Sequence, residues 1–302
     1  MIEANGLTKR YGGATAVDDL TFTVRPGEVT GFLGPNGAGK TTTLRMLLGL
    51  VGPTSGTATV RGRPFRDHPR GLRHVGALLD AGDVHGGRSA RAHLAVLARS
   101  NGIPRARVDG VLEEVGLAAA ARRRVAGFSL GMRQRLGIAT ALLGDPPVLL
   151  FDEPLNGLDP EGVLWVRGLF RRLAAEGRTV FVSSHLMTEM EHTADRLVVI
   201  GRGSLIAAES LSAFAARSAR RSVTVRTPDA ADLTPLLTAE GASVAGDGDR
   251  LTVTGLPAER IGELALRHRV LLHELTAFGA SLEEAFMELT ADSVQYPAGD
   301  PR

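Results

Sequence analysis

Short apolar runs alternate with longer helix-forming segments along the first two thirds of the chain. The clearest mostly apolar runs are residues 29–33, 148–151, 179–183 and 197–200. Continuous apolar runs of this length are typical of strands that are buried on both faces of a parallel sheet. Between them, the pattern predicts helices at residues 129–143 and 160–176, the second opened by Pro160. This alternation predicts an α/β fold with helices on both faces of a parallel sheet.

Two segments with different patterns of apolar and polar residues interrupt this alternation. Near the N-terminus, residues 2–10 and 19–24 read as strands, since Leu20, Phe22 and Val24 alternate with polar residues. Shorter strands are expected at residues 57–61 and 74–79. From Ser89, a plausible N-cap, the pattern becomes helical. We therefore predict an antiparallel β subdomain and a helical subdomain at about residues 85–145, both belonging to a domain that spans residues 1–216.

The C-terminal part of the chain has a different character. Residues 217–221 are small and basic and are interpreted as a linker. Beyond them, strands are expected at 222–227, 242–245, 250–254 and 270–276, and helices at 230–240, 258–268 and 281–290. The order β-α-β-β-α-β matches a split βαβ unit. Residues 222–291 are therefore predicted to form a small ferredoxin-like α+β accessory domain, followed by a tail at 292–302.

Composition excludes several function classes. The 302 residues include no cysteine, so disulfides and thiolate metal sites are excluded. The net charge is only +2, and aromatic residues make up 4%, which argues against a nucleic-acid partner. The N-terminal residues do not resemble a signal peptide, and no apolar window approaches a membrane span. These features favour a cytosolic protein with a substantial core.

Residues 34–42 form a phosphate-binding loop of the form G-x-x-x-x-G-K-[ST]. An apolar run precedes the loop and a helix-forming run follows it, which is the setting that such a loop requires. Glycines allow the backbone N–H groups to turn inward, and the following helix adds its positive dipole end. Lys40 can bind the outer phosphates, and Thr41 can offer its hydroxyl to Mg²⁺. The residues expected to bind the nucleotide here are Gly34, Asn36, Gly37, Ala38, Gly39, Lys40, Thr41 and Thr42.

Two acids end the apolar run 148–151. Asp152 is placed to bind the metal ion beside the phosphate loop, and Glu153 is placed to orient or deprotonate the attacking water. Two solvated acids at the end of a strand are the alternative interpretation.

A third motif, Ser129 to Arg135, lies between the loop and the acids. Ser129 is positioned as an N-cap, and the unpaired N–H groups of the helix start could form a second anion site.

Taken together, these motifs resemble the ATP-binding cassette (ABC) superfamily over about residues 2–216. Residues 34–42 resemble its Walker A loop, residues 149–153 its Walker B strand, and residues 129–134 its signature sequence. Residues 156–159 resemble its D-loop, and His185 resembles its switch histidine. Tyr11 resembles the aromatic residue that stacks on adenine, with Val17 beside it.

The resemblance implies an ATPase that works as a head-to-tail dimer with Mg²⁺ as cofactor. Ser129, Gly131 and Asp159 would then act in trans, against ATP held by the Lys40 of a second copy. His185 would act with Glu153 on the γ-phosphate and water. The signature departs from the family pattern, because Leu130 and Met132 replace its first glycine and its glutamine. In addition, Asp80 stands where the family commonly has a metal-contacting glutamine, so Asp80 is a weak candidate metal ligand.

Residues 76–81, the Gly-Met-Arg-Gln-Arg stretch and the C-terminal unit resemble the daunorubicin- and bacitracin-exporter branch. This resemblance implies export of a drug, antibiotic or lipid-like molecule through a separate permease at the cytoplasmic face of the membrane. The alternative is a soluble ABC ATPase associated with ribosomes or DNA. A GTPase or kinase is a third possibility, although no guanine-reading N-K-x-D-like motif is present. The identity of the cargo and the role of the C-terminal unit cannot be predicted from these residues.

Overall fold

The computed structural model describes residues 1–218, 222–278 and 282–290. The chain forms two compact units, one of residues 1–211 with residues 289–290, and one of residues 212–288. The predicted linker at 217–221 starts inside helix α7 (Leu211–Ser218), and its residues 219–221 lie outside the described residues. The predicted tail at 292–302 also lies outside them.

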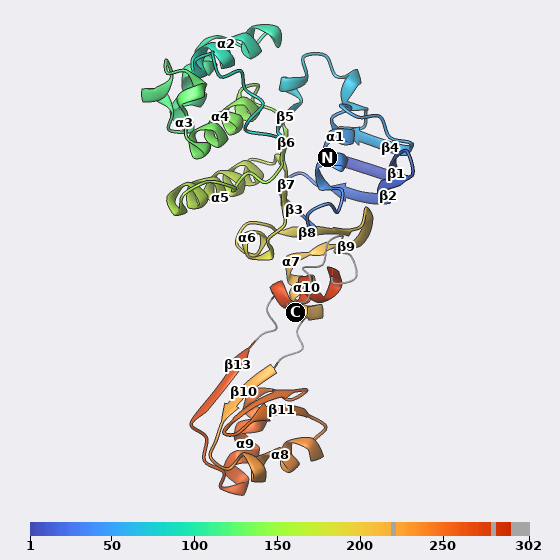
Figure 1. The fold of residues 1–302 in the computed structure, drawn as a ribbon, viewed down its shortest axis with the longest axis vertical. Coiled ribbons are helices and arrows are strands. Elements are labelled where there is room, and N and C mark those ends of the chain that lie inside the picture. The colour runs from blue at the N-terminus through green and yellow to red at the C-terminus, as the bar shows by residue number, and fades with distance from the viewer. Residues whose placement is uncertain (219–221, 279–281, 291–302) are drawn as a thin grey trace, which may run out of the picture. The chain divides into compact units, whose positions relative to one another are not determined.

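A six-stranded sheet organises the first unit (Figure 1). Its order is β5 (Val75–Leu78), β6 (Val148–Phe151), β7 (Thr179–Ser184), β3 (Val29–Leu33), β8 (Arg196–Gly201) and β9 (Ser204–Ser210). The first five strands in this order are parallel, and β9 runs antiparallel to β8. Because parallel strands end at one edge, the segments that follow β3, β6 and β7 come together there.

A three-stranded antiparallel sheet has the order β2 (Ala14–Val24), β1 (Ile2–Tyr11) and β4 (Ser55–Val60). It shares its core with the six-stranded sheet, since Phe22 of β2 packs against Phe32 and Phe181 with ring centroids 5.7–5.8 Å apart. Strand β2 starts before the predicted residue 19, because the chain turns back directly after β1 and pairs Ala14 with Tyr11.

Helices α2 (Ala90–Ser100), α3 (Ala106–Glu114) and α4 (Leu130–Leu142) form a helical group within residues 85–145, on the opposite side of the six-stranded sheet from β1, β2 and β4 (Figure 1). The remaining helices of this unit are α1 (Lys40–Leu47), α5 (Pro160–Ala175) and α6 (Met187–Glu191). Side-chain caps start three of the helices, with Ser89, Ser129 and Asp159 each accepting a hydrogen bond from a backbone N–H. The sequence did not predict α6, which is too short to show a helical period.

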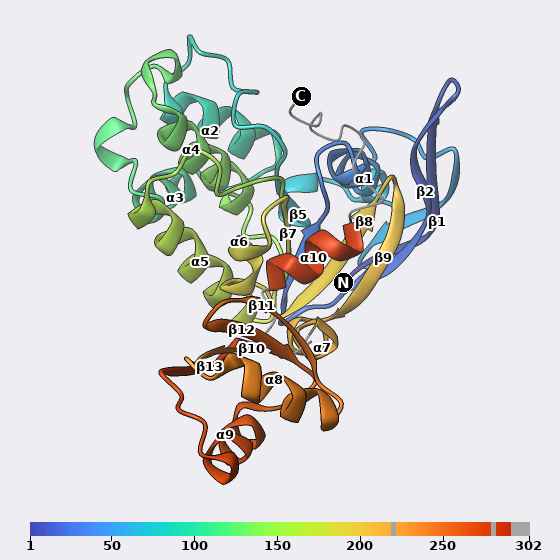
Figure 2. The same ribbon diagram turned by 60° about the horizontal axis from the view of Figure 1, so that its bottom comes forward.

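In the second unit, helices α8 (Ala230–Ala239) and α9 (Ala258–His268) cover one face of a four-stranded sheet (Figure 2). The strands are β10 (Ser222–Arg226), β11 (Ser243–Asp247), β12 (Arg250–Thr254) and β13 (Glu274–Phe278), in the antiparallel order β11-β12-β10-β13. The core between the sheet and the two helices includes Val223 and Val253 from the strands, Leu237 from α8 and Ile261 from α9. Helix α10 (Leu282–Thr290) follows the sheet in sequence.

The last strand of this unit was predicted at residues 270–276 but begins at Glu274. Arg269 adopts a left-handed conformation at the end of α9, and the N–H of Val270 bonds back to that helix. The next residues are held by the loop that follows β10, since the N–H of Leu271 donates to the carboxylate of Asp229. Regular pairing with β10 can start only beyond these contacts, at Glu274 and Arg226.

Candidate active site

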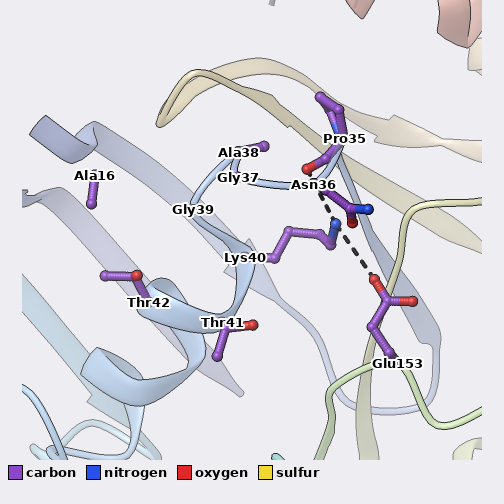
Figure 3. Close-up of a pocket in the computed structure, with 10 residues that line it drawn as sticks. All are labelled: Ala16, Pro35, Asn36, Gly37, Ala38, Gly39, Lys40, Thr41, Thr42 and Glu153. Atoms are coloured by element: carbon purple, nitrogen blue, oxygen red, sulfur yellow. Dashed lines mark hydrogen bonds and ion pairs between the residues drawn. The ribbon is translucent and has the colours of Figure 1, made fainter. Parts of the chain in front are cut away.

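The phosphate-binding loop connects β3 to α1 and lines a pocket of about 270 Å³ (Figure 3). Gly37 and Gly39 have φ angles of 81° and 100°, which glycine adopts at little cost. Space also requires a glycine at Gly39, because a Cβ there would lie 2.5 Å from the carbonyl oxygen of Ala16. The pocket is lined by Ala16, Pro35, Asn36, Gly37, Ala38, Gly39, Lys40, Thr41, Thr42 and Glu153.

Lys40 lies in this pocket with only 7% of its surface exposed. Its Nζ donates to the carbonyl oxygen of Gly34 at 2.6 Å. It also donates to the carbonyl oxygen of Pro35 at 3.4 Å and lies 3.5 Å from Oε1 of Glu153 (Figure 3). Burial lowers the pKa of the Lys40 ammonium, and the nearby Glu153 carboxylate partly offsets this effect. This buried ammonium faces two carbonyl oxygens and one carboxylate, and its positive charge is suited to bind an anion such as a phosphate.

Asp152 follows β6 and is held by two hydroxyl groups. Thr41 donates to Oδ2 of Asp152 at 2.6 Å, and Ser183 of β7 donates to Oδ1 at 2.5 Å. The carboxylate is buried, with an exposed fraction of 8%. The structure thus brings Asp152 next to the first turn of α1, although 111 positions separate it from Thr41.

The side chain of Glu153 contacts both the phosphate-binding loop and the segment that follows β7. Its Oε1 faces Lys40, and its Oε2 lies 2.9 Å from Nδ1 of His185. The backbone of Glu153 has a φ angle of 48°, which is uncommon for a residue with a side chain. The carboxylate therefore lies between a cation and an imidazole at the rim of the pocket.

A second pocket of about 440 Å³ lies at the start of α4 and shares no lining residue with the first. Oγ of Ser129 accepts from the N–H of Met132 at 3.2 Å, and Asp159 caps α5 through the N–H of Gly162. Gly157 must be a glycine here, since it has a φ angle of 75° and a Cβ would collide with Leu130. The lining residues are Ser129, Leu130, Gly131, Met132, Arg135, Gly157, Leu158 and Asp159.

The structure places three other candidate residues away from these contacts. Asp80 is exposed, and its Oδ1 accepts from the N–H of Gly82 at 2.6 Å. Tyr11 is half exposed at the end of β1, with the Nζ of Lys9 5.0 Å from its ring centroid. The side chain of Val17 is fully buried in the core, and the neighbouring Ala16 lines the pocket instead.

Comparison with known proteins shows which family this chain resembles. The model described as "ABC transporter" matches residues 17–156. The uncharacterized ABC transporter ATP-binding protein YhcH of Bacillus subtilis is 36% identical over 97% of both chains. The bacitracin transport ATP-binding protein BcrA of Bacillus licheniformis is 44% identical over 68% of both. The Nod factor export ATP-binding protein I of Paraburkholderia xenovorans is 43% identical over 71% of this chain and 72% of its own.

The chain belongs to the family of ABC transporter ATP-binding proteins. It is therefore an ATPase subunit that binds ATP. A solved ATP-binding subunit of an ABC transporter is 27% identical and superposes with a TM-score of 0.66, covering 72% of this chain and 92% of its own. Residues 221–283 match a separate model, described as a domain of unknown function. Nothing in these comparisons favours a ribosome- or DNA-associated ATPase.

Two residues that contact the acidic pair were not among the sequence candidates of this ABC ATPase. Ser183 bonds to Asp152, and Nε2 of Gln134 donates to the carbonyl oxygen of Glu153 at 3.1 Å. Ser183 ends an apolar run and reads as the end of a buried strand. Gln134 lies in the signature stretch, and its spacing on α4 gives no sign that it faces β6.

Proposed function

We propose that this ATPase hydrolyses MgATP in a head-to-tail pair with a second copy and drives export of a small molecule through a separate permease. The observation that carries the pairing is that one chain presents two separate half-sites. One contains Lys40 and Glu153, and the other contains Ser129 and Gly131, without a common lining residue. A nucleotide placed between two copies could contact one half-site of each.

In the proposed site, Thr41 and Asp152 would hold Mg²⁺. Both offer hard oxygen ligands of the type that Mg²⁺ prefers, and their 2.6 Å hydrogen bond places them as close as two ligands of one small cation. The bound cation would neutralise phosphate charge, and Lys40 would bind the outer phosphates. We assign Asp80 no ligand role, because its carboxylate is exposed, accepts from the N–H of Gly82 and does not line the Lys40 pocket.

Glu153 is the proposed general base. Its carboxylate is fixed on one side by Lys40 and on the other by Nδ1 of His185. When a phosphate binds Lys40, the ammonium group interacts with the phosphate as well as with Glu153. The Glu153 carboxylate then becomes available to accept a proton from water. The hydrogen bond at Nδ1 orients the imidazole of His185, so that its Nε2 can meet the γ-phosphate or the water.

The export role is supported by the names of the relatives, which include bacitracin transport and Nod factor export proteins. These names favour an antibiotic- or lipid-like cargo. No helix in the described part of the chain is long and apolar enough to cross a membrane. Because these relatives are named as ATP-binding proteins of transport and export systems, we assign the membrane path to a permease on another chain, with this subunit bound peripherally at the cytoplasmic face.

For residues 222–291 we propose a ferredoxin-like accessory domain. The sheet order β11-β12-β10-β13 and the alternation of strands with α8 and α9 support this assignment. The domain carries its own core, which is consistent with independent folding.

The export assignment can be tested by purification from membranes. The tagged Glu153→Gln chain, loaded with ATP to stabilise the closed pair, should recover a polytopic membrane protein in a fixed ratio. The matched control is Lys40→Ala, which should lose ATP binding and weaken recovery. Recovery with ribosomes or DNA, and with no membrane protein, would contradict the assignment.

A further inference from the structure

The backbone of Glu153 is held at both of its polar groups by buried side chains. Its N–H donates to Oγ of Ser183 at 2.9 Å, and its carbonyl oxygen accepts from Nε2 of Gln134 at 3.1 Å. Ser183 is fully buried and Gln134 is 5% exposed. They belong to different elements, β7 and α4, so Glu153 is fixed from two directions.

This attachment matters because Glu153 adopts a left-handed conformation, with a φ angle of 48°. A residue with a side chain keeps such a conformation only when the surroundings hold it there. If the backbone relaxed toward the extended region, the Cα–Cβ bond would turn away from its present direction. The carboxylate would then lose its place between Lys40 and His185.

The Ser183 hydroxyl performs a second task with its proton. It donates to Oδ1 of Asp152 at 2.5 Å while its lone pair accepts from the N–H of Glu153. One buried oxygen therefore fixes the orientation of the Asp152 carboxylate and the backbone of Glu153 together. Because the proton and the lone pair have different partners, the hydroxyl group cannot rotate away from one partner without also losing the other.

We propose that Ser183 and Gln134 are positioning residues for the Glu153 carboxylate, an inference that rests on the proposed role of Glu153 as general base. Neither residue lines the nucleotide pocket. Gln134 contacts the acidic pair only at Glu153, whereas Ser183 also holds the carboxylate of Asp152. Gln134 also belongs to α4, whose first turn lines the Ser129 pocket. The position of Glu153 is thus tied to the helix that would contact the ATP of the other half-site.

The test compares Ser183→Ala and Gln134→Leu with Ser184→Ala. Ser184 is a matched control, since it is equally buried on the same strand, but its hydroxyl donates to Glu189. We expect kcat to fall by about 10²-fold in the first two variants, as for a misplaced catalytic group. KM for ATP should stay within about threefold in Gln134→Leu, whose metal and nucleotide contacts are unchanged, whereas Ser183→Ala should also raise KM because Asp152 loses a hydrogen bond. Ser184→Ala should keep kcat within about threefold.

The decisive readout is the effect of each change in a Glu153→Gln background, followed by single-turnover hydrolysis. Gln134→Leu should cause no further loss once that carboxylate is gone, whereas Ser183→Ala should keep only the part of its loss that arises through Asp152. A full multiplicative loss in this background would overturn the positioning role. The role would also be overturned if Ser183→Ala, Gln134→Leu and Ser184→Ala all lowered kcat by the same factor and lowered the melting temperature by the same amount.

The two proposals can fail separately. If Glu153→Gln hydrolyses ATP at the wild-type rate, the assignment of Glu153 as base is wrong and the positioning role falls with it. If Glu153→Gln is inactive while Ser183→Ala and Gln134→Leu are fully active, only the positioning role is wrong.

Discussion

Replacing Glu153 by glutamine is the most direct test of the proposed chemistry. Glutamine has nearly the same shape, and its amide oxygen can still accept a hydrogen bond from Nδ1 of His185, now 2.9 Å from Oε2. The change removes the negative charge that faces Lys40 at 3.5 Å and the capacity to take a proton from water. Geometry is therefore preserved while the acid–base function is lost.

The expected size of the effect follows from these contacts. A positioned general base contributes about 10²–10⁴ in rate, which corresponds to roughly 3–5 kcal/mol of barrier. The folded state loses one partner of a largely buried ion pair, which can cost about 3–5 kcal/mol in the absence of nucleotide. ATP binding should persist or tighten, because the remaining charge of Lys40 is no longer shared with Glu153. The variant should accumulate as an ATP-bound dimer.

Phosphate release under saturating MgATP measures the first effect, and size-exclusion chromatography with and without ATP measures the second. Glu191→Gln serves as the control, since this carboxylate is exposed at the end of α6. It should leave both readouts unchanged. Turnover of Glu153→Gln within about tenfold of wild type would refute the base assignment, because it lies below the range of general-base contributions.

Three further outcomes can be measured. Mixing Lys40→Ala chains with Ser129→Arg chains should restore one composite site and a fraction of wild-type turnover, whereas a mixture as inactive as its components would contradict head-to-tail pairing. Gly76→Ala should lower the free energy of unfolding by about 1–3 kcal/mol, because a Cβ there collides with a backbone carbonyl of α4. By contrast, Gly168→Ala, in open space on α5, should raise it by about 0.5–1 kcal/mol, and calorimetry showing equal effects would refute this packing argument. Burial raises the pKa of the Glu189 carboxyl, so its stabilising contribution is present at low pH and is lost as pH rises through the folded-state pKa. The melting temperature of Glu189→Gln relative to wild type should therefore increase with pH, and a flat difference would contradict the burial effect.

The sequence predicted the parallel sheet well, because strands buried on both faces leave uninterrupted apolar runs. Residues 29–33 and 148–151 were predicted with the bounds that β3 and β6 have. The helix from Pro160 was also expected, since Asp159 and Pro160 form a recognisable helix start. Local signals of this kind survive in the folded chain because the tertiary structure agrees with them.

Two strands with weak or displaced local patterns were harder to predict. Strand β9 pairs antiparallel with β8 and has a mixed burial pattern, so its residues showed no clear period. Strand β13 was placed four positions early, because contacts of residues 269–271 with α9 and Asp229 delay its pairing. For β13 a deciding contact is with Asp229, far back in the chain, whereas β9 pairs with the strand directly before it.

The candidate site shows the same division. Lys40, Thr41 and Asp152 could be predicted because their chemistry requires fixed spacing within a loop or at a strand end. Whether Val17 reaches the pocket could not be predicted, since neighbours on a strand face opposite sides and a shift of one residue exchanges them.

Ser183 and Gln134 mark the limit of sequence reasoning for a different reason. A serine at the end of a buried strand gives no local sign of its partners, and neither does a glutamine inside a helix. Their function would arise from the sheet order, which places β7 beside β6, and from the packing of α4, which brings Gln134 to Glu153. If the positioning role holds, the precision of the catalytic carboxylate is a property of the folded sheet rather than of the motif that contains it. A chain with intact Walker motifs but without the side chain of Gln134 should then bind ATP normally and hydrolyse it slowly.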